Sequence, residues 1–215
     1  MLEFNKIYLG DCLDIMKQIP DKSIDLVLTD PPYGIGIKGK VGGGSKRGAS
    51  KDFGDVSWDN EIPQKEMFDE IFRISKEQII FGGNYFIEYF NNTPCFLVWY
   101  KRDGLPTRTF ADAELAWTSF KSPTRVYNFR HDGFISDSKD KKVHPTQKPT
   151  ELFKQIVADY SKEGMTILDP FAGSGTTAIA CHDLKRNFIC IEKEPEYVEI
   201  SQKRLAEAKM QLSLF

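Results

Sequence analysis

The sequence Thr29-Asp30-Pro31-Pro32-Tyr33-Gly34 directly follows an apolar segment, residues 24–28, whose composition predicts a buried β-strand. Neither proline can donate a hydrogen bond to a sheet, and each biases the preceding residue towards extended backbone, so the strand is expected to end here. Open α/β sheets bind ligands at the carboxyl ends of their strands. Here Asp30 supplies an acceptor carboxylate, the Pro-Pro segment a free carbonyl and Tyr33 an aromatic ring. Together they suit a planar group with an NH₂, such as an exposed nucleobase; the alternative is a polar turn without function.

The composition predicts one globular domain over residues 1–215, because the chain is 40% hydrophobic and can bury a core. The net charge of −2 excludes a globally basic nucleic-acid binder, so any such surface must be local. Two segments are locally basic: residues 34–57 have a net charge of +3, and residues 101–148 of +4. Without a membrane-length apolar segment or a signal-peptide pattern, the chain is expected to be soluble and cytoplasmic. Four cysteines without CxxC spacing predict reduced core residues and no metal site: Cys12, Cys95, Cys181 and Cys190.

Strands and helices are expected to alternate through the first half of the chain. Strands are predicted at residues 6–10, 24–28, 78–82 and 95–100. Helices are predicted after Asp11, from Pro63 and at residues 85–90. Asp11 is also a candidate helix cap at the carboxyl end of the first strand. This β-α-β alternation predicts a parallel sheet that is covered on both faces.

Residues 34–57 are rich in Gly, Ser and Lys and show almost no periodicity. A loop of more than about 20 residues is uncommon in a compact domain unless it is functional or disordered. Its position after the Pro-Pro segment predicts a mobile basic loop that closes over a phosphate-bearing ligand, and a solvated linker is the alternative. The candidate DNA contacts in it are Lys38, Lys40, Lys46, Arg47 and Lys51.

Residues 101–143 interrupt the regular alternation. Two strands are predicted, at residues 113–119 and 125–129, among scattered basic and aromatic side chains. That mixture suits contacts to phosphates and unstacked bases, although a β-rich subdomain with a solvated face would look similar. The candidate DNA contacts here are Arg102, Arg108, Arg125 and Arg130.

The last third returns to regular α/β structure, with a helix capped by Thr150, a strand at residues 165–168, a helix at 178–184, a strand at 188–192 and a terminal helix at 195–211. Between the first of these strands and the next helix stands Asp169-Pro170-Phe171-Ala172-Gly173-Ser174-Gly175-Thr176-Thr177. Glycines in that position let a ligand approach the backbone, but the sequence is neither a P-loop nor GxGxxG. Asp169 would repel a pyrophosphate and pair with an ammonium, which favours a nucleoside that includes an amino acid. Glu192 ends the next strand about 20 residues on, where a carboxylate suits ribose hydroxyls.

Together these segments resemble the DNA amino-methyltransferases that use S-adenosylmethionine, in the permuted group whose catalytic half comes first. The matching segments are Asp30-Pro31-Pro32-Tyr33 for the catalytic motif, residues 169–175 for the cofactor loop and His144-Pro145-Thr146-Gln147-Lys148-Pro149 just before that loop. The resemblance implies a Rossmann-like, mostly parallel twisted α/β sheet with helices on both faces. It also implies S-adenosylmethionine as cofactor, double-stranded DNA as partner, and a small irregular target-recognition insertion at residues 101–143.

The resemblance also assigns roles to single residues. Tyr33 would stack on a flipped base, while Asp30 and the Pro31 carbonyl hold its amino group, with Pro32 as the remaining member of the motif. In the cofactor site, Asp169 and Phe171 would contact the methionine part, Glu192 the ribose and Asp11 the adenine amine. Thr146 and Lys148 would lie near the methionine carboxylate, and the loop itself contributes Gly173, Gly175 and Thr176.

Several alternatives stay open on the sequence alone. Asp30 in the first motif position favours adenine-N6 as target, but cytosine-N4 fits the same chemistry. A nicotinamide-dependent oxidoreductase, a methyltransferase of RNA or protein, and a non-catalytic nucleic-acid-binding module are the other function classes. The sequence also leaves open the recognition sequence and the oligomeric state, for which a homodimer is one possibility. It does not distinguish a restriction-modification context from a phage or orphan context.

Overall fold

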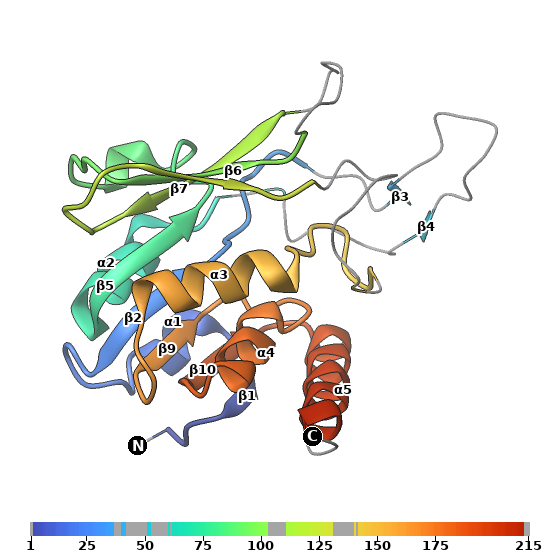
Figure 1. The fold of residues 1–215 in the computed structure, drawn as a ribbon. Helices are drawn as coiled ribbons and strands as arrows, with labels where there is room; N and C mark the ends of the chain where they lie inside the picture. The colour runs from blue at the N-terminus through green and yellow to red at the C-terminus, as the bar shows by residue number, and fades with distance from the viewer. Residues whose placement is uncertain are drawn as a thin grey trace.

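The computed structural model describes residues 2–36, 40–41, 51–52, 60, 62–102, 111–130, 140 and 142–212. Its main feature is an eight-stranded sheet in the order β1-β10-β9-β2-β5-β7-β6-β8 (Figure 1). β7 is antiparallel to both of its neighbours, and every other pairing in this sheet is parallel. The predicted mostly parallel α/β sheet is therefore confirmed. The strands are β1 (Lys6–Leu9), β2 (Ile24–Thr29), β5 (Ser75–Phe81), β6 (Phe96–Tyr100), β7 (Ala113–Thr118), β8 (Arg125–Asn128), β9 (Thr166–Asp169) and β10 (Asn187–Glu192).

Helices cover both faces of the sheet, as expected. One hydrophobic cluster contains buried residues of α1 (Cys12–Met16) and α2 (Lys65–Ile74), and another contains those of α3 (Thr150–Tyr160), α4 (Thr176–Asp183) and α5 (Pro195–Leu212). Figure 1 shows α3 and α4 together on one side of the strands. The first strand pairs with the last, so both ends of the chain belong to one sheet.

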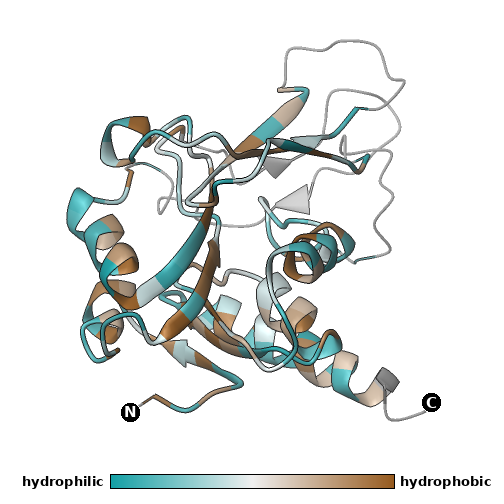
Figure 2. Cartoon of the chain, turned by 60° about the vertical axis from the view of Figure 1, so that its left-hand side comes forward, coloured by the Kyte–Doolittle hydropathy of each residue, from teal (hydrophilic) through white to brown (hydrophobic). Residues whose placement is uncertain are grey.

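Side chains of the central strands alternate between the two clusters. In β2, Leu26 and Leu28 belong to the cluster of α3 and α4, whereas Val27 belongs to that of α1 and α2. In β5, Phe81 and Ile80 divide in the same way. This is the two-residue period of a strand whose faces are both buried, and it explains why these strands are almost continuously apolar. Figure 2 shows the hydrophobic residues gathered on these strands and on the inner sides of the helices.

The helix α2 connects β2 to β5 and shows its amphipathic pattern clearly. Its buried residues Met67, Phe68, Ile71 and Ile74 recur three or four positions apart, which places them on one side of a helix. On the other side, Arg73 pairs with Glu70 at 2.7 Å and with Asp21 at 2.5 Å. Burial of the apolar side sets the path of the chain from β2 to β5.

Four details differ from the expectations. First, the two strands predicted within residues 101–143 are present as β7 and β8, but they belong to the main sheet: β7 lies between β5 and β6, and β8 extends the same sheet. Second, the 34–57 loop contains a short antiparallel pair, β3 (Lys40–Val41) and β4 (Lys51–Asp52), although its predicted mobility falls mostly outside the described residues. Third, the helix expected at residues 85–90 is only a 3₁₀ helix, η2 (Ile87–Tyr89). Fourth, Pro149 and not Thr150 is the N-cap of α3, and Asp140 accepts the Thr150 amide at 2.8 Å.

In the described part of the chain, no helix combines the length and the apolar character that crossing a membrane requires. Cys95, Cys181 and Cys190 are buried and Cys12 is half-buried, and all four are free thiols. Among all residues that the structure describes, no group of three or more His, Cys, Asp or Glu side chains is arranged to hold a metal ion.

Candidate active site

The carboxyl ends of β2 and β9 lie side by side at a point where the connections of the sheet diverge. β2 continues into α2 on one face, and β9 continues into α4 on the other. Such a switch point leaves a crevice outside the strand ends. A cavity of about 590 Å³ lies here, a volume typical of cofactor sites. Of the predicted site residues, Asp11, Asp30, Pro32, Thr146, Lys148, Asp169, Phe171, Gly173, Thr176 and Glu192 line it, and Pro31, Tyr33 and Gly175 do not.

Asp169 joins the two strands at the base of this cavity. Its carboxylate accepts hydrogen bonds from the Thr29 hydroxyl at 2.8 Å, the Thr177 hydroxyl at 2.5 Å and the Phe171 amide at 3.1 Å. Burial raises the pKa of Asp169 to about 6, although these hydrogen bonds oppose the rise, and the residue is 3% exposed. Asp169 therefore has a structural role in addition to any contact with a ligand's ammonium.

The glycine loop needs its glycines for two different reasons. Gly173 has φ +50° and borders the cavity, and a Cβ there would stand 3.7 Å from Nε2 of His144. Gly175 has φ +78° and is the N-cap of α4; a Cβ there would stand 2.7 Å from Cβ of Ser201 in α5. Gly173 is thus placed for close approach of a ligand, whereas Gly175 permits the close packing of α5.

Two acidic residues stand at the ends of the neighbouring strands. Glu192, at the end of β10, accepts the Gly173 amide at 2.7 Å and the Glu194 amide at 2.9 Å. Burial raises the pKa of Glu192, while these two amides oppose the rise. Asp11, after β1, accepts the Leu13 amide at 2.9 Å and so caps α1. Each carboxylate oxygen has two acceptor positions, so both groups can still accept from a ligand's hydroxyl or amine.

Asp30 and Tyr33 contact each other directly. The Tyr33 hydroxyl donates to Oδ1 of Asp30 at 2.5 Å, across the rigid turn that Pro31 and Pro32 form. Asp30 lines the cavity, while Pro31 is buried and is not among its lining residues. The Pro-Pro turn thus presents a carboxylate at the cavity wall, as the sequence predicts.

The Tyr33 ring packs against two aromatic neighbours. Tyr85 stacks on it with ring centroids 4.9 Å apart and an angle of 15° between the planes, and Phe86 meets it edge-on at 6.2 Å. Tyr85 is 45% exposed, so this pair opens to solvent on one side. Tyr85 was not predicted, because an aromatic residue in a short turn has no distinctive sequence signal.

Lys148 is directed at Asp30 rather than towards the glycine loop. Its ammonium forms an ion pair with Oδ2 of Asp30 and a second one, at 3.1 Å, with Glu114 of β7. Lys148 also lines the cavity, so its contact with the methionine carboxylate of a cofactor stays a prediction. Glu114 also pairs with Lys101 at 2.9 Å. Sequence reasoning missed Glu114, since nothing in the sequence indicates that β7 lies close enough to the Pro-Pro turn.

His144, Thr146 and Tyr197 line the other side of the cavity. The rings of His144 and Tyr197 lie 4.2 Å apart, and the Thr146 hydroxyl lies 3.1 Å from Nδ1 of His144. Burial lowers the pKa of His144 to about 3, with the positive charge of Lys148 adding to the effect, so the ring is neutral at pH 7. Tyr197 was missed because it lies in the terminal helix, where a single aromatic residue indicates a core position and not a binding site.

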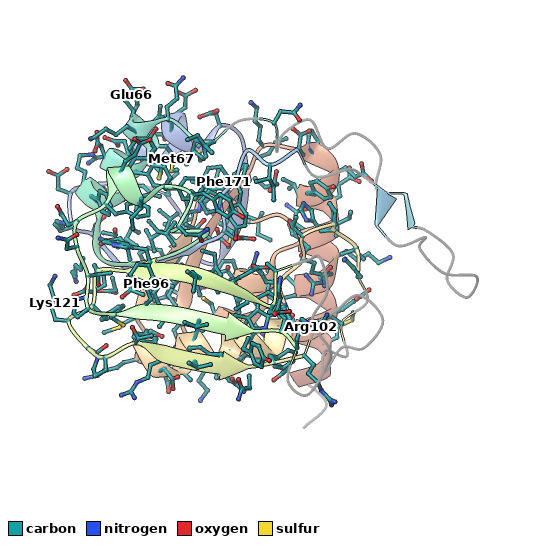
Figure 3. The ribbon with its side chains drawn as sticks, turned by 90° about the horizontal axis from the view of Figure 1, so that it is seen from above. Glu66, Met67, Phe96, Arg102, Lys121 and Phe171 are labelled. Atoms are coloured by element: carbon teal, nitrogen blue, oxygen red, sulfur yellow. The ribbon has the colours of Figure 1, made fainter. Side chains whose placement is uncertain are left out.

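The predicted DNA contacts are only partly described. Lys38, Lys46, Arg47 and Arg108 lie outside the described residues, and Lys40 and Lys51 are described only by their backbone in β3 and β4. Arg125 on β8 and Arg130 after it are exposed. Arg102 is 4% exposed and pairs with Asp112 at 3.0 Å, so its predicted role as a surface contact does not fit the structure. In Figure 3, Arg102 lies away from Met67 and Phe171, two residues that line the cavity.

The groups around the cavity fit a nucleoside that includes an amino acid. Asp11 and Glu192 are acceptors for hydroxyl and amine donors, Phe171 and Tyr197 offer rings, and Asp169 offers negative charge. No side chain among the lining residues is arginine, and the described basic ones are Lys148 and Lys193. The set therefore suits neutral and cationic ligand parts better than a pyrophosphate.

A family model described as DNA methylase, N6_N4_Mtase, matches residues 84–203 of this chain. Among the similar proteins is the Type II methyltransferase M.HinfI of Haemophilus influenzae. It is 29% identical over an alignment 253 residues long, which covers 95% of this chain and 69% of that protein.

Two solved structures illustrate the likeness in fold. The M1.HpyAVI–SAM complex has a TM-score of 0.61 at 26% identity, over 93% of this chain and 99% of that chain. The PvuII DNA methyltransferase, described as cytosine-N4-specific, has a TM-score of 0.61 at 16% identity, over 94% of this chain and 90% of that chain. At that identity the second likeness shows the fold alone.

Proposed function

The chain belongs to the N6_N4 family of DNA methylases, and on that basis we propose that it transfers a methyl group from S-adenosylmethionine to the exocyclic amine of a flipped DNA base, adenine-N6 first. One observation supports this most: the Asp30 carboxylate stands at the wall of the cavity, next to Tyr33, at the junction of β2 and β9. An acceptor for the amine is thereby placed beside a cofactor-sized space.

The cofactor would be held by residues that line the cavity. Glu192 takes the ribose hydroxyls and Asp11 the adenine amine, while Asp169 and Phe171 face the methionine part. S-Adenosylmethionine, when bound, supplies an electrophilic sulfonium methyl: the N–CH₃ bond forms as the S–CH₃ bond breaks, the electron pair stays on sulfur, and the nitrogen then loses a proton to water. The M1.HpyAVI–SAM complex, similar over 93% of this chain, supports this choice of cofactor.

Asp30 and Pro31 activate the amine by accepting its two N–H groups. An exocyclic amine is a weak nucleophile because its lone pair is delocalised into the ring. Two acceptors outside the plane of the base favour a tetrahedral nitrogen whose lone pair points at the methyl group, which lowers the barrier of transfer. No cysteine nucleophile is part of this scheme, and burial raises the pKa of Cys12, which lines the cavity, to about 12.

The target base must leave the duplex to reach Asp30, at a cost of a few kcal/mol. Stacking on Tyr33 returns about 1–3 kcal/mol of this. Since Tyr85 covers one face of the Tyr33 ring, the base stacks on the other face or replaces Tyr85. Tyr85 is exposed enough to move without opening the core.

The DNA duplex is expected to contact the two basic segments, residues 34–57 and 101–143. The loop 34–57 follows the Pro-Pro turn directly, and residues 101–143 include β7, whose Glu114 reaches Lys148 beside Asp30. Target recognition by residues 101–143, and closure of the loop 34–57 over the extruded base, remain part of the proposal.

The proposal is tested in a host that lacks DNA methylases of its own. Genomic DNA from cells expressing the chain, or its Asp30→Ala variant, is sequenced with modification-sensitive reads. We expect N6-methyladenine at one short sequence with the wild-type chain and none with the variant. N4-methylcytosine at one short sequence would instead favour the cytosine alternative, and an unmodified genome or methylation at cytosine C5 would refute amino-methylation.

A further inference from the structure

Asp30, the proposed amine acceptor, already has a protein donor on each of its oxygens. The Tyr33 hydroxyl donates to Oδ1 at 2.5 Å, and the Lys148 ammonium pairs with Oδ2. Lys148 is 6% exposed, so this ion pair is screened little by water. An amine that binds Asp30 must share or displace one of these donors.

A second carboxylate stands ready to hold the displaced ammonium. Oε2 of Glu114 lies 3.1 Å from the Lys148 nitrogen, and the other oxygen of Glu114 accepts from Lys101 at 2.9 Å. Two ammonium and two carboxylate groups thus form a row with no net charge, which a buried site tolerates better than an unpaired ion. A lysine can shift its ammonium along such a row because four rotatable bonds support a compact point charge.

The charges along this row oppose each other at Asp30. Burial raises the pKa of the Asp30 carboxyl; the Lys148 ammonium opposes the rise, and Glu114 adds to it. At Glu114, burial is outweighed by Lys148 and Lys101, which lower its pKa to about 2. Burial likewise fails to lower the pKa of Lys148, because Asp30 and Glu114 raise it. Without Lys148, Asp30 would face Glu114 as a like charge and would take up a proton more readily.

We infer that Lys148 is a positioning residue of the methyl transfer: its ammonium holds the Asp30 carboxylate ionised and aimed until the base amine arrives, and Glu114 then retains the ammonium so that Asp30 can accept from the amine. No bond is made or broken at Lys148. This inference rests on the proposed function, since it assigns the same Asp30 as the amine acceptor.

The test is the pH profile of kcat for methyl transfer from labelled S-adenosylmethionine to DNA from a methylase-free host, between pH 5 and 9. Lys148→Met should move the acidic limb to higher pH by about one unit or more, because an opposite charge has been removed from Asp30. Lys148→Arg should keep the limb close to that of the wild-type protein. Adding Glu114→Gln to Lys148→Met should move the limb back, because the like charge is then removed as well.

Lys154 provides a matched control. It also pairs with two carboxylates, Glu151 at 3.0 Å and Asp183 at 2.8 Å, but lies between α3 and α4 away from the cavity. Lys154→Met should leave the limb unchanged. The other titratable groups that interact with this row are Lys101, Tyr33, Asp169 and His144, and none of them is substituted in any variant.

A missing cooperative unfolding transition would show that Lys148→Met does not fold. In that case Glu114→Gln alone tests the inference. Glu114→Gln keeps an accepting amide oxygen but removes the negative charge that retains the ammonium, so Lys148 stays on Asp30 and kcat should fall at least tenfold. The Kd of S-adenosylmethionine should stay within about twofold, and Glu114→Asp should restore most of the rate. A wild-type kcat in Glu114→Gln, or an unmoved limb in folded Lys148→Met, would overturn the inference. Absence of transfer by the wild-type protein would instead refute the proposed function.

Discussion

The ring of Tyr33 occupies the space beside Gly82 where any other residue would place its Cβ, since a Cβ built at Gly82 would stand 2.1 Å from Cε1 of Tyr33. Gly82 directly follows β5 and has φ +69°, a conformation that L side chains rarely adopt. The end of β5 therefore sets the position of the ring that the proposed mechanism uses for stacking. β5 and the Pro-Pro turn thus form one unit around the Tyr33 side chain.

Gly82→Ala should displace the Tyr33 ring and reduce methyl transfer at least tenfold, with little change in cofactor affinity. The matched control is Gly164→Ala: Gly164 has φ +83°, and a Cβ there would meet nothing within 4 Å. Both substitutions incur a left-handed backbone cost of about 1 kcal/mol, but only the first meets the ring. Equal activity of the two variants at matched fractions of folded protein would contradict the assigned role of the Tyr33 position.

Asp169 should make the ligand-free protein less stable as the pH rises through 6. Burial raises the pKa of its folded-state carboxyl from 3.8 to about 6, so between these values the folded protein binds a proton that the unfolded chain does not. The contribution is fully present below the unfolded pKa and disappears as the pH passes the folded one, by about 3 kcal/mol in all. Asp169→Asn keeps an oxygen that can accept from the Phe171 amide, but it removes the pH-dependent contribution of the carboxyl to stability. Urea unfolding at pH 4 and 7 measures the free energy of unfolding of both proteins. Relative to the wild-type protein, the variant should be more stable at pH 7 than at pH 4. The same stability difference at both pH values would contradict this prediction.

The same substitution should weaken cofactor binding. Loss of a charged partner for the ammonium of the methionine part should cost roughly 1.5–3 kcal/mol, and the loss in Glu192→Gln should be smaller, about 0.5–1.5 kcal/mol, because hydroxyls are neutral partners. Titration calorimetry with S-adenosylmethionine measures both. If neither variant changes the affinity, the cofactor binds elsewhere.

The basic loop is tested through the salt dependence of DNA binding. Side chains that bind phosphates release counterions, so removing one such side chain should flatten the log–log slope by about one unit. Neutralising Lys46, Arg47 and Lys51 together should therefore weaken binding most at low salt and leave cofactor affinity unchanged. The same measurement on Arg125→Ala, in the exposed edge strand β8, tests whether residues 101–143 also contact phosphates. An unaltered slope in the triple variant would mean that the loop only links β2 to α2.

Much of the fold follows from the sequence, because both faces of the sheet are buried. The apolar segments at residues 24–28 and 188–192 are nearly continuous, and the structure places them at Ile24–Thr29 and Asn187–Glu192. Strand order does not follow in the same way. Nothing local in Ala113–Thr118 indicates that it lies antiparallel between β5 and β6, because that place depends on partners such as Ile80 opposite Trp117.

The site could be predicted where a motif fixes the backbone and not where side chains meet across the fold. Asp30 and Asp169 lie at strand ends that the prolines and glycines mark, and the structure brings both to one cavity. Lys148 was assigned to the cofactor by its motif alone. Its ion pair with Asp30 joins segments 118 positions apart, and its ion pair with Glu114, 34 positions earlier in the chain, depends on the placement of β7.

The most direct measurement is methyl transfer by the purified protein, with labelled S-adenosylmethionine and DNA from a methylase-free host, followed by separation of the nucleosides. With the wild-type protein, the label should appear in N6-methyl-2′-deoxyadenosine. Asp30→Ala should abolish labelling while binding the cofactor within a few-fold of the wild-type affinity. Asp30 is the proposed acceptor for the base and belongs to a different segment from the glycine loop. Glu114 should still pair with Lys148 in this variant. Label transferred by Asp30→Ala at a near wild-type rate, or no label on any exocyclic amine with the wild-type protein, would contradict the account.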